Sequence, residues 1–143
     1  LAKLLDDILE MLKHQFEVNN ITVERDFRRL PPEMAADPTE IEQIFTNLFV
    51  NAIQVMPAGG TLRVSLDHND LELQVTVKDT GPGIPREEQG RIFDPFFTTK
   101  ETGTGLGLSV VLRIVRNYGG RIEVESDGMS GTSFSVHLPL FEQ

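Results

Sequence analysis

The stretch DPTEIEQIFTNLFVNAIQVM, residues 37–56, is the centre of the predicted fold. Asp37 suits the N-cap of a helix and Pro38 its first position, and Glu40 places negative charge at the positive end of the helix dipole. Apolar residues recur at three- and four-residue steps and form one wide stripe: Ile41, Ile44, Phe45, Leu48, Phe49, Ala52, Ile53 and Met56. We predict a core helix that ends in the Pro-Ala-Gly-Gly sequence of residues 57–60.

Two pairs of alternating segments follow this helix and predict β-hairpins. The first pair covers residues 61–67 and 71–78, and the second covers 121–126 and 132–138. Between the pairs, residues 79–103 are rich in Gly, Pro and Thr. A loop of this length is typical of a lid or a binding loop.

The remaining segments complete the predicted architecture. Apolar spacing predicts helices over residues 1–19 and 105–118, with a short helical piece near 86–93. Alternation predicts a strand over 21–27, and residues 33–36 suit a short edge strand. This order predicts an α/β (α+β) two-layer sandwich, in which a mixed sheet of about five strands packs on three helices.

Length and composition limit the function classes. The 143 residues predict a single domain, residues 1–143, and 39% hydrophobic residues are typical of a globular protein. Thirteen basic and 22 acidic side chains give a net charge of −9, which argues against nucleic-acid binding or direct membrane contact. The absence of Cys excludes disulfides and thiolate chemistry. Without an initiator Met or a signal pattern, the sequence is expected to be a piece of a longer chain.

Three amides form the first group of candidate functional residues. Gln43, Asn47 and Asn51 are spaced at four-residue intervals and therefore lie on one face of the predicted helix, beside its apolar stripe. Partly buried amides need partners. They either form a polar face that water covers, or they supply oxygen ligands to a hard cation such as Mg²⁺.

The second group is the sequence Asp-Thr-Gly-Pro-Gly-Ile-Pro at residues 79–85. Asp79 ends a predicted strand, so it either starts a turn or accepts a hydrogen bond from a ligand amine. In the second case, Gly81 and Gly83 would allow the backbone to approach the ligand closely.

The third group is GTGLGL, residues 103–108, which leads into a helix. Backbone amides at a glycine-rich helix start make an anion site, although a hinge without a ligand would also use such glycines. The Gly-Lys-Ser/Thr of a Walker A loop is absent, and the glycine spacing differs from the dinucleotide-binding fingerprint.

The fourth group is Phe-Asp-Pro-Phe-Phe-Thr-Thr-Lys, residues 93–100. Adjacent aromatic side chains in a polar loop would anchor the loop or contact a partner. Lys100 lies three residues before the glycine run, so it is either a solvated lysine or the partner of a phosphate bound there.

In this order, followed by Gly131-Thr132, these groups resemble the ATP-binding domain of sensor histidine kinases. The superfamily to which that domain belongs also includes type II topoisomerases, mismatch-repair ATPases and the large heat-shock chaperone ATPases. The resemblance extends from about residue 4 to residue 138, and residues 93–100 look most like the nitrogen-regulation subgroup. It implies the Bergerat ATP-binding fold, with ATP and Mg²⁺ as cofactors.

The resemblance also implies the site residues. Asn51 would ligate Mg²⁺, Asn47 would support the metal or the phosphates, and Asp79 would accept the adenine amino group. Residues 86–102 would form a lid over the nucleotide, and Lys100 would pair with the γ-phosphate. The other implied nucleotide-binding residues are Gly81, Gly83, Ile84, Gly103, Thr104, Gly105, Leu106, Gly107, Leu108 and Thr132.

Some positions depart from the family pattern. Many superfamily members carry a water-activating Glu where this chain has Asn47, and an amide cannot act as a general base. Many histidine kinases carry a basic residue where this chain has Gln54, and Lys100 would supply that charge instead. The family's phosphoacceptor His is followed by an acidic residue, which none of the histidines here has: His14, His68 and His137.

The function implied is transfer of the γ-phosphoryl of Mg-ATP to a histidine on a separate, upstream dimerisation domain. A response regulator would then take the phosphoryl group. The resemblance implies a cytoplasmic domain, whose parent kinase is either soluble or anchored in the inner membrane. There are two alternatives: an ATPase that couples hydrolysis to conformational change, and a non-enzymatic ATP-binding module.

Overall fold

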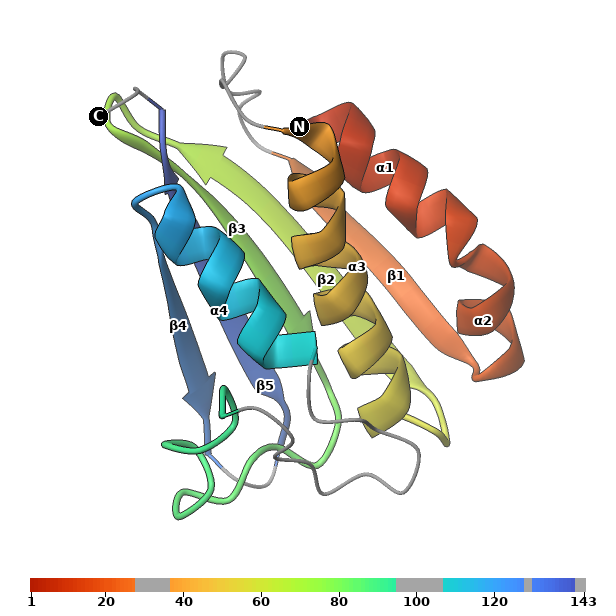
Figure 1. Ribbon diagram of the computed structural model, residues 1–143. Helices are drawn as coiled ribbons and strands as arrows, with labels where there is room; N and C mark the ends of the chain where they lie inside the picture. Colours follow the sequence, from red (N-terminus) through yellow and green to blue (C-terminus); the bar gives the residue numbers. More distant parts are fainter. Residues whose placement is uncertain (28–36, 95–106, 128–129, 141–143) are drawn as a thin grey trace.

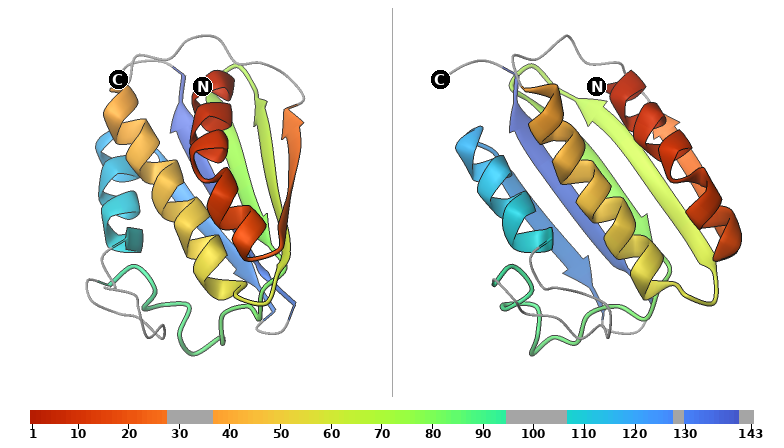
Figure 2. Two further views of the ribbon diagram at one scale, coloured as in Figure 1. Left: turned by 90° about the vertical axis from the view of Figure 1, so that its right-hand side faces the viewer. Right: turned by 45° about the vertical axis from the view of Figure 1, so that its right-hand side comes forward.

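A five-stranded mixed sheet with its helices on one face forms the structure (Figures 1 and 2). The computed structural model describes residues 1–27, 37–94, 107–127 and 130–140. Its elements, in chain order, are α1 (Ala2–Met11), α2 (Lys13–Val18), β1 (Ile21–Phe27), α3 (Pro38–Val55), β2 (Gly60–His68), β3 (Glu72–Asp79), α4 (Gly107–Asn117), β4 (Arg121–Ser126) and β5 (Thr132–Pro139).

The strands lie in the order β1-β2-β3-β5-β4. Strand β1 runs parallel to β2, as a strand connected through a helix can, whereas the other neighbours are antiparallel. The predicted two-layer α/β arrangement is confirmed. Because β3 and β5 pair in antiparallel fashion, the end of β3 lies beside the start of β5, with Asp79 opposite Thr132.

The core lies between the sheet and the helices. Alternate residues of β2, β3 and β5 point toward the helices and are buried: Leu62, Val64, Leu66, Leu73, Val75, Val77, Phe134, Val136 and Leu138. Helix α3 lies between α1 and α4 in Figure 2 and buries the stripe expected from its sequence. Asp37 caps it, since its Oδ1 accepts a hydrogen bond from the Thr39 N–H at 2.9 Å.

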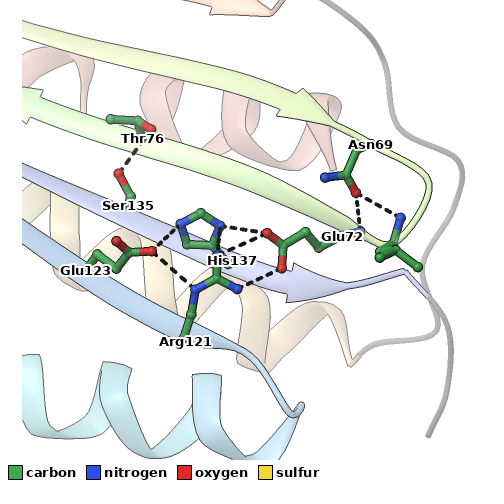
Figure 3. Close-up of polar contacts among 8 residues, drawn as sticks. Asn69, Glu72, Thr76, Arg121, Glu123, Ser135 and His137 are labelled. Carbon is green, nitrogen blue, oxygen red and sulfur yellow. Dashed lines mark hydrogen bonds and ion pairs between the residues drawn. The ribbon is translucent and has the colours of Figure 1, made fainter.

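Polar side chains cover the opposite face of the sheet. In Figure 3, His137 of β5 lies between Glu72 and Glu123, with ring nitrogens 3.1 and 3.0 Å from their carboxylate oxygens. Arg121 forms a bidentate ion pair with Glu72, at 2.9 and 3.2 Å. The hydrogen bonds from Arg121 lower the pKa of Glu72, more than burial of the carboxyl raises it.

The structure refines several predicted elements. The expected helix over 1–19 is interrupted at Leu12, but its apolar stripe stays buried across the break. Residues 86–93 form successive turns instead of the expected helical piece, and Gly90 within them disfavours a helix. The expected strand at 33–36 lies outside the described residues.

Candidate functional site

Segments from α3, β3, α4 and β5 meet at one end of the sheet (Figure 1). The C-terminal half of α3, the last residue of β3, the first residue of α4 and the first residue of β5 all lie there. Asp79, Gly107 and Thr132 stand at these strand and helix ends. The tertiary fold therefore brings together residues that are far apart in the sequence.

Asp79 is buried at the end of β3, with 3% of its surface exposed. Its Oδ1 accepts hydrogen bonds from the backbone N–H of Gly81 at 2.9 Å and of Thr132 at 3.3 Å. These bonds offset the cost of burying a carboxylate and fix its orientation. Thr132 is itself buried, 5% exposed, on the neighbouring strand.

Gly81 brings the loop after β3 against the last turn of α3. A Cβ atom at this position would lie 2.9 Å from the carbonyl oxygen of Val55 and 3.1 Å from Oδ1 of Asp79. A side chain there would push the loop away from the helix and from the carboxylate. Glycine is thus required for close approach of the backbone.

The amides of α3 connect this loop to the start of α4. A Cβ atom on Gly107 would lie 3.9 Å from Cγ of Asn47, so the first residue of α4 borders Asn47. Asn47, Asn51 and Val55 are four residues apart and lie on one helix face, about 6 Å from one to the next. Asn51 is therefore placed between the α4 N-terminus and the Asp79 loop.

The burial of the three predicted amides differs. Asn47 and Asn51 are half-buried, as expected for residues beside an apolar stripe. Gln43, one turn before Asn47, is exposed. Its expected partial burial is wrong, because this turn of α3 directs Gln43 and its neighbour Glu42 to solvent.

Ser126 and Gln89 hold the loop after β3, and the sequence motifs did not indicate either residue. The Ser126 hydroxyl accepts a hydrogen bond from the Ile84 N–H at 2.8 Å and donates one to the Gly131 carbonyl at 2.9 Å. Gln89 Nε2 donates to the carbonyls of Ile84 and Ser126, at 3.0 and 3.1 Å. A serine at a strand end and a glutamine in a loop carry no distinctive signal.

The arrangement combines groups that suit a nucleotide. It offers a buried carboxylate for an amine, amide oxygens for a hard cation, and the N-terminus of an 11-residue helix for an anion. Residues 36–142 match the family described as histidine kinase-, DNA gyrase B- and HSP90-like ATPases. The chain belongs to this family of ATPases.

Similar proteins place the domain among the sensor histidine kinases. Sporulation kinase A of Bacillus subtilis (strain 168) is 38% identical over 139 residues, which is 97% of this chain and 23% of that protein. Sensor histidine kinase ZraS of Escherichia coli (strain K12) is 41% identical over 109 residues, 76% of this chain and 23% of that protein. The chain thus spans about a quarter of these relatives' length.

A solved structure agrees with this placement. The catalytic domain of histidine kinase ThkA superposes with a TM-score of 0.88 and is 31% identical, over 97% of this chain and 93% of that chain. The expected family and fold are confirmed. The nitrogen-regulation subgroup stays a prediction.

Several predicted site residues of this ATPase domain lie outside the described part of the chain: Lys100, Gly103, Thr104, Gly105 and Leu106. Of the same glycine run, Gly107 and Leu108 form the first residues of α4. Within the described residues, no group of three or more His, Cys, Asp or Glu side chains could hold a metal ion.

The first part of the predicted lid is anchored. Ile92 is buried, with 6% of its surface exposed, and Phe93 contacts Phe134 of β5 edge-on, with ring centroids 6.5 Å apart.

Across the described ranges of the ATPase domain, we find no helix with the length and apolar character needed to cross a bilayer.

Proposed function

We propose that this domain binds Mg-ATP and is the catalytic part of a sensor histidine kinase. The alignment of three groups carries the proposal: the Asp79 carboxylate, the amide face of α3 and the N-terminus of α4. The Asp79 loop borders the last turn of α3, the amides lie on the helix itself, and the start of α4 borders Asn47. The three groups therefore have the same order as the base, the metal and the phosphates of a bound nucleotide.

Asp79 would accept a hydrogen bond from the adenine amino group. Its orientation is held by Gly81 and Thr132, so the carboxylate would not have to reorganise on binding. Gly83 and Ile84 would line the same pocket from the loop, and Thr132 would close it from β5.

Asn51 would provide an amide oxygen to Mg²⁺, and Asn47 would support the metal or the phosphates. Mg²⁺ prefers a small number of protein oxygens together with phosphate oxygens, which the donor set of α3 fits. When bound, Mg²⁺ would neutralise charge on the phosphates. The N–H groups at the start of α4 would hold phosphate oxygens, since they point out of the helix end.

The phosphoryl acceptor would be a histidine on a separate, upstream dimerisation domain. Asn47 cannot activate water, which favours transfer over hydrolysis. Lys100 would pair with the γ-phosphate, and residues 86–102 would act as the lid. A solved structure of ThkA with the response regulator TrrA, in which ThkA is 29% identical to this chain, supports a receiver domain as the final acceptor.

The test is phosphotransfer from radiolabelled ATP. The chain alone, the upstream helical hairpin of its parent kinase alone, and both together are incubated with Mg²⁺. Label is expected on the hairpin only in the mixture, as acid-labile phosphohistidine. Asn51→Ala should abolish the transfer, whereas the control Asn117→Ala, at the exposed end of α4, should not.

Rapid hydrolysis of ATP by the chain alone would support the alternative ATPase function. Nucleotide binding without label on the hairpin would support a non-enzymatic module. Circular dichroism of Asn51→Ala should show an intact fold, so that loss of transfer reports on the site.

A further inference from the structure

We propose that Ser126 and Gln89 are positioning residues for recognition of the purine base. Neither belongs to the motifs quoted for the resemblance, although Gln89 lies within residues 86–102, the implied lid. The inference rests on the proposed function, because it assigns Ser126 and Gln89 the task of holding the pocket around Asp79. Their expected effect is on the choice of base, not on phosphate binding.

Ser126 joins the two sides of this pocket with one hydroxyl group. As an acceptor it holds the Ile84 N–H, on the loop after β3, and as a donor it holds the Gly131 carbonyl, just before β5. The hydroxyl therefore fixes the separation between the loop and the start of β5. A side chain without a hydroxyl could keep neither bond.

Gln89 completes the attachment of the loop. Its Nε2 donates to the carbonyls of Ile84 and Ser126, so both backbone polar groups of Ile84 have a partner. A backbone held at both its N–H and its C=O has little freedom to shift. The position of Ile84 is then set by side chains and not by the loop alone.

These contacts continue to the carboxylate. Gly131 precedes Thr132, whose N–H binds Oδ1 of Asp79, and Gly81 binds the same oxygen from the loop side. The contacts therefore form a ring from Asp79 through the loop to Ser126, and back through Gly131 and Thr132 to Asp79. Removing the Ser126 hydroxyl breaks this ring, so the carboxylate would lose its fixed position relative to the walls of the pocket.

The consequence is measurable as base discrimination. ATP and inosine triphosphate carry the same ribose and phosphates, but inosine has an oxo group where adenine has the amino group. An Asp79 carboxylate held in place accepts from the amino group and repels the oxo group. The ratio of the two dissociation constants therefore reports on the position of Asp79, independently of the phosphates.

We would measure both dissociation constants by calorimetry on the 143-residue chain with Mg²⁺. The parent should prefer ATP by at least about tenfold. Ser126→Ala and Gln89→Ala should each lower this ratio of dissociation constants by about fivefold, the change expected when one hydrogen bond is lost. The conservative Ser126→Thr, which keeps the hydroxyl, should restore it.

Ser133→Ala and Gln74→Ala are matched controls, since both residues belong to the central strands and face away from the helices. They should leave the preference unchanged. A role in stability alone would weaken both nucleotides equally and leave the ratio unaltered, which would overturn the proposal. Gln89→Ala decides the matter if Ser126→Ala does not fold.

Failure of the proposed function has a different signature. A parent chain that binds neither nucleotide, or binds both equally, would contradict the proposed adenine site. A parent that prefers ATP, loses the preference with Asp79→Asn and keeps it with Ser126→Ala and Gln89→Ala would contradict this inference alone.

Discussion

The hydroxyl of Tyr118 accepts a hydrogen bond from the backbone N–H of Asp37, at 2.9 Å. It also donates to the Glu40 carboxylate, at 3.0 Å. Tyr118 directly follows α4, and Asp37 and Glu40 form the N-cap and the first turn of α3. One hydroxyl thus joins the start of α3 to the end of α4, which is the end opposite to Gly107. Burial raises the pKa of Tyr118 more than the hydrogen bond from the Asp37 N–H lowers it, and the bond to Glu40 adds to the rise.

Tyr118→Phe should lower the free energy of unfolding by about 1 kcal/mol, because it removes these bonds and keeps the ring. Urea denaturation measures the change. Combining it with Glu40→Gln gives a double-mutant cycle, and a coupling energy is expected because the residues are in contact. Strict additivity of the two substitutions would contradict a bond between them.

Gly131→Ala should destabilise the domain by roughly 2 kcal/mol or more. Gly131 has a φ of +118°, and a Cβ atom there would overlap the carbonyl oxygen of Asp79. Gly90→Ala is the matched control, since nothing lies within 4 Å of a Cβ at that position. Thermal unfolding of the two variants makes the comparison, and equal midpoints would contradict the close approach of Gly131 to Asp79.

Asp79→Asn should weaken ATP binding at least tenfold, from the loss of a charged acceptor worth roughly 1.5–3 kcal/mol. The amide keeps an oxygen that can accept from Gly81 and Thr132, so most of the fold's stability should remain. Calorimetric titration with Mg-ATP gives the affinity. A dissociation constant within twofold of the parent's would count against the assigned role.

Glu72→Gln should change how stability depends on pH. Because the pKa of Glu72 is lowered in the folded protein, chiefly by Arg121, the unfolded state binds the proton more readily. The contribution of Glu72 is therefore present above its unfolded pKa and is lost as the pH falls through the lower, folded one. The parent should lose more stability than Glu72→Gln between pH 6 and 3, measured by urea denaturation at each pH.

Glu125→Gln, which removes the same charge from β4, the strand on the far side of β5, is the control for that series. It should follow the parent's acid profile more closely than Glu72→Gln does. Coincident profiles for all three proteins would show that the Arg121 ion pair has no effect on stability, which is a common result for exposed pairs.

The predictions from sequence succeeded where short-range patterns decide the structure. The apolar stripe and cap of α3, and the alternation in β2, β3, β4 and β5, are local, and they match the elements within a few residues. The motif order was enough to identify the ATPase family. Residues 86–93 failed as a helix, because a Gly in the segment and contacts with the sheet outweigh its helical propensity.

What the sequence alone determined is thus the set of elements, the family and the residue types available for binding. Only the tertiary structure decided which of these residues meet. The pairing of β3 with β5 brings Thr132 to Asp79 across 53 positions of sequence, and Ser126 reaches Ile84 across 42. No local pattern encodes such contacts, because they depend on strand order and register, which the packing of the whole core establishes.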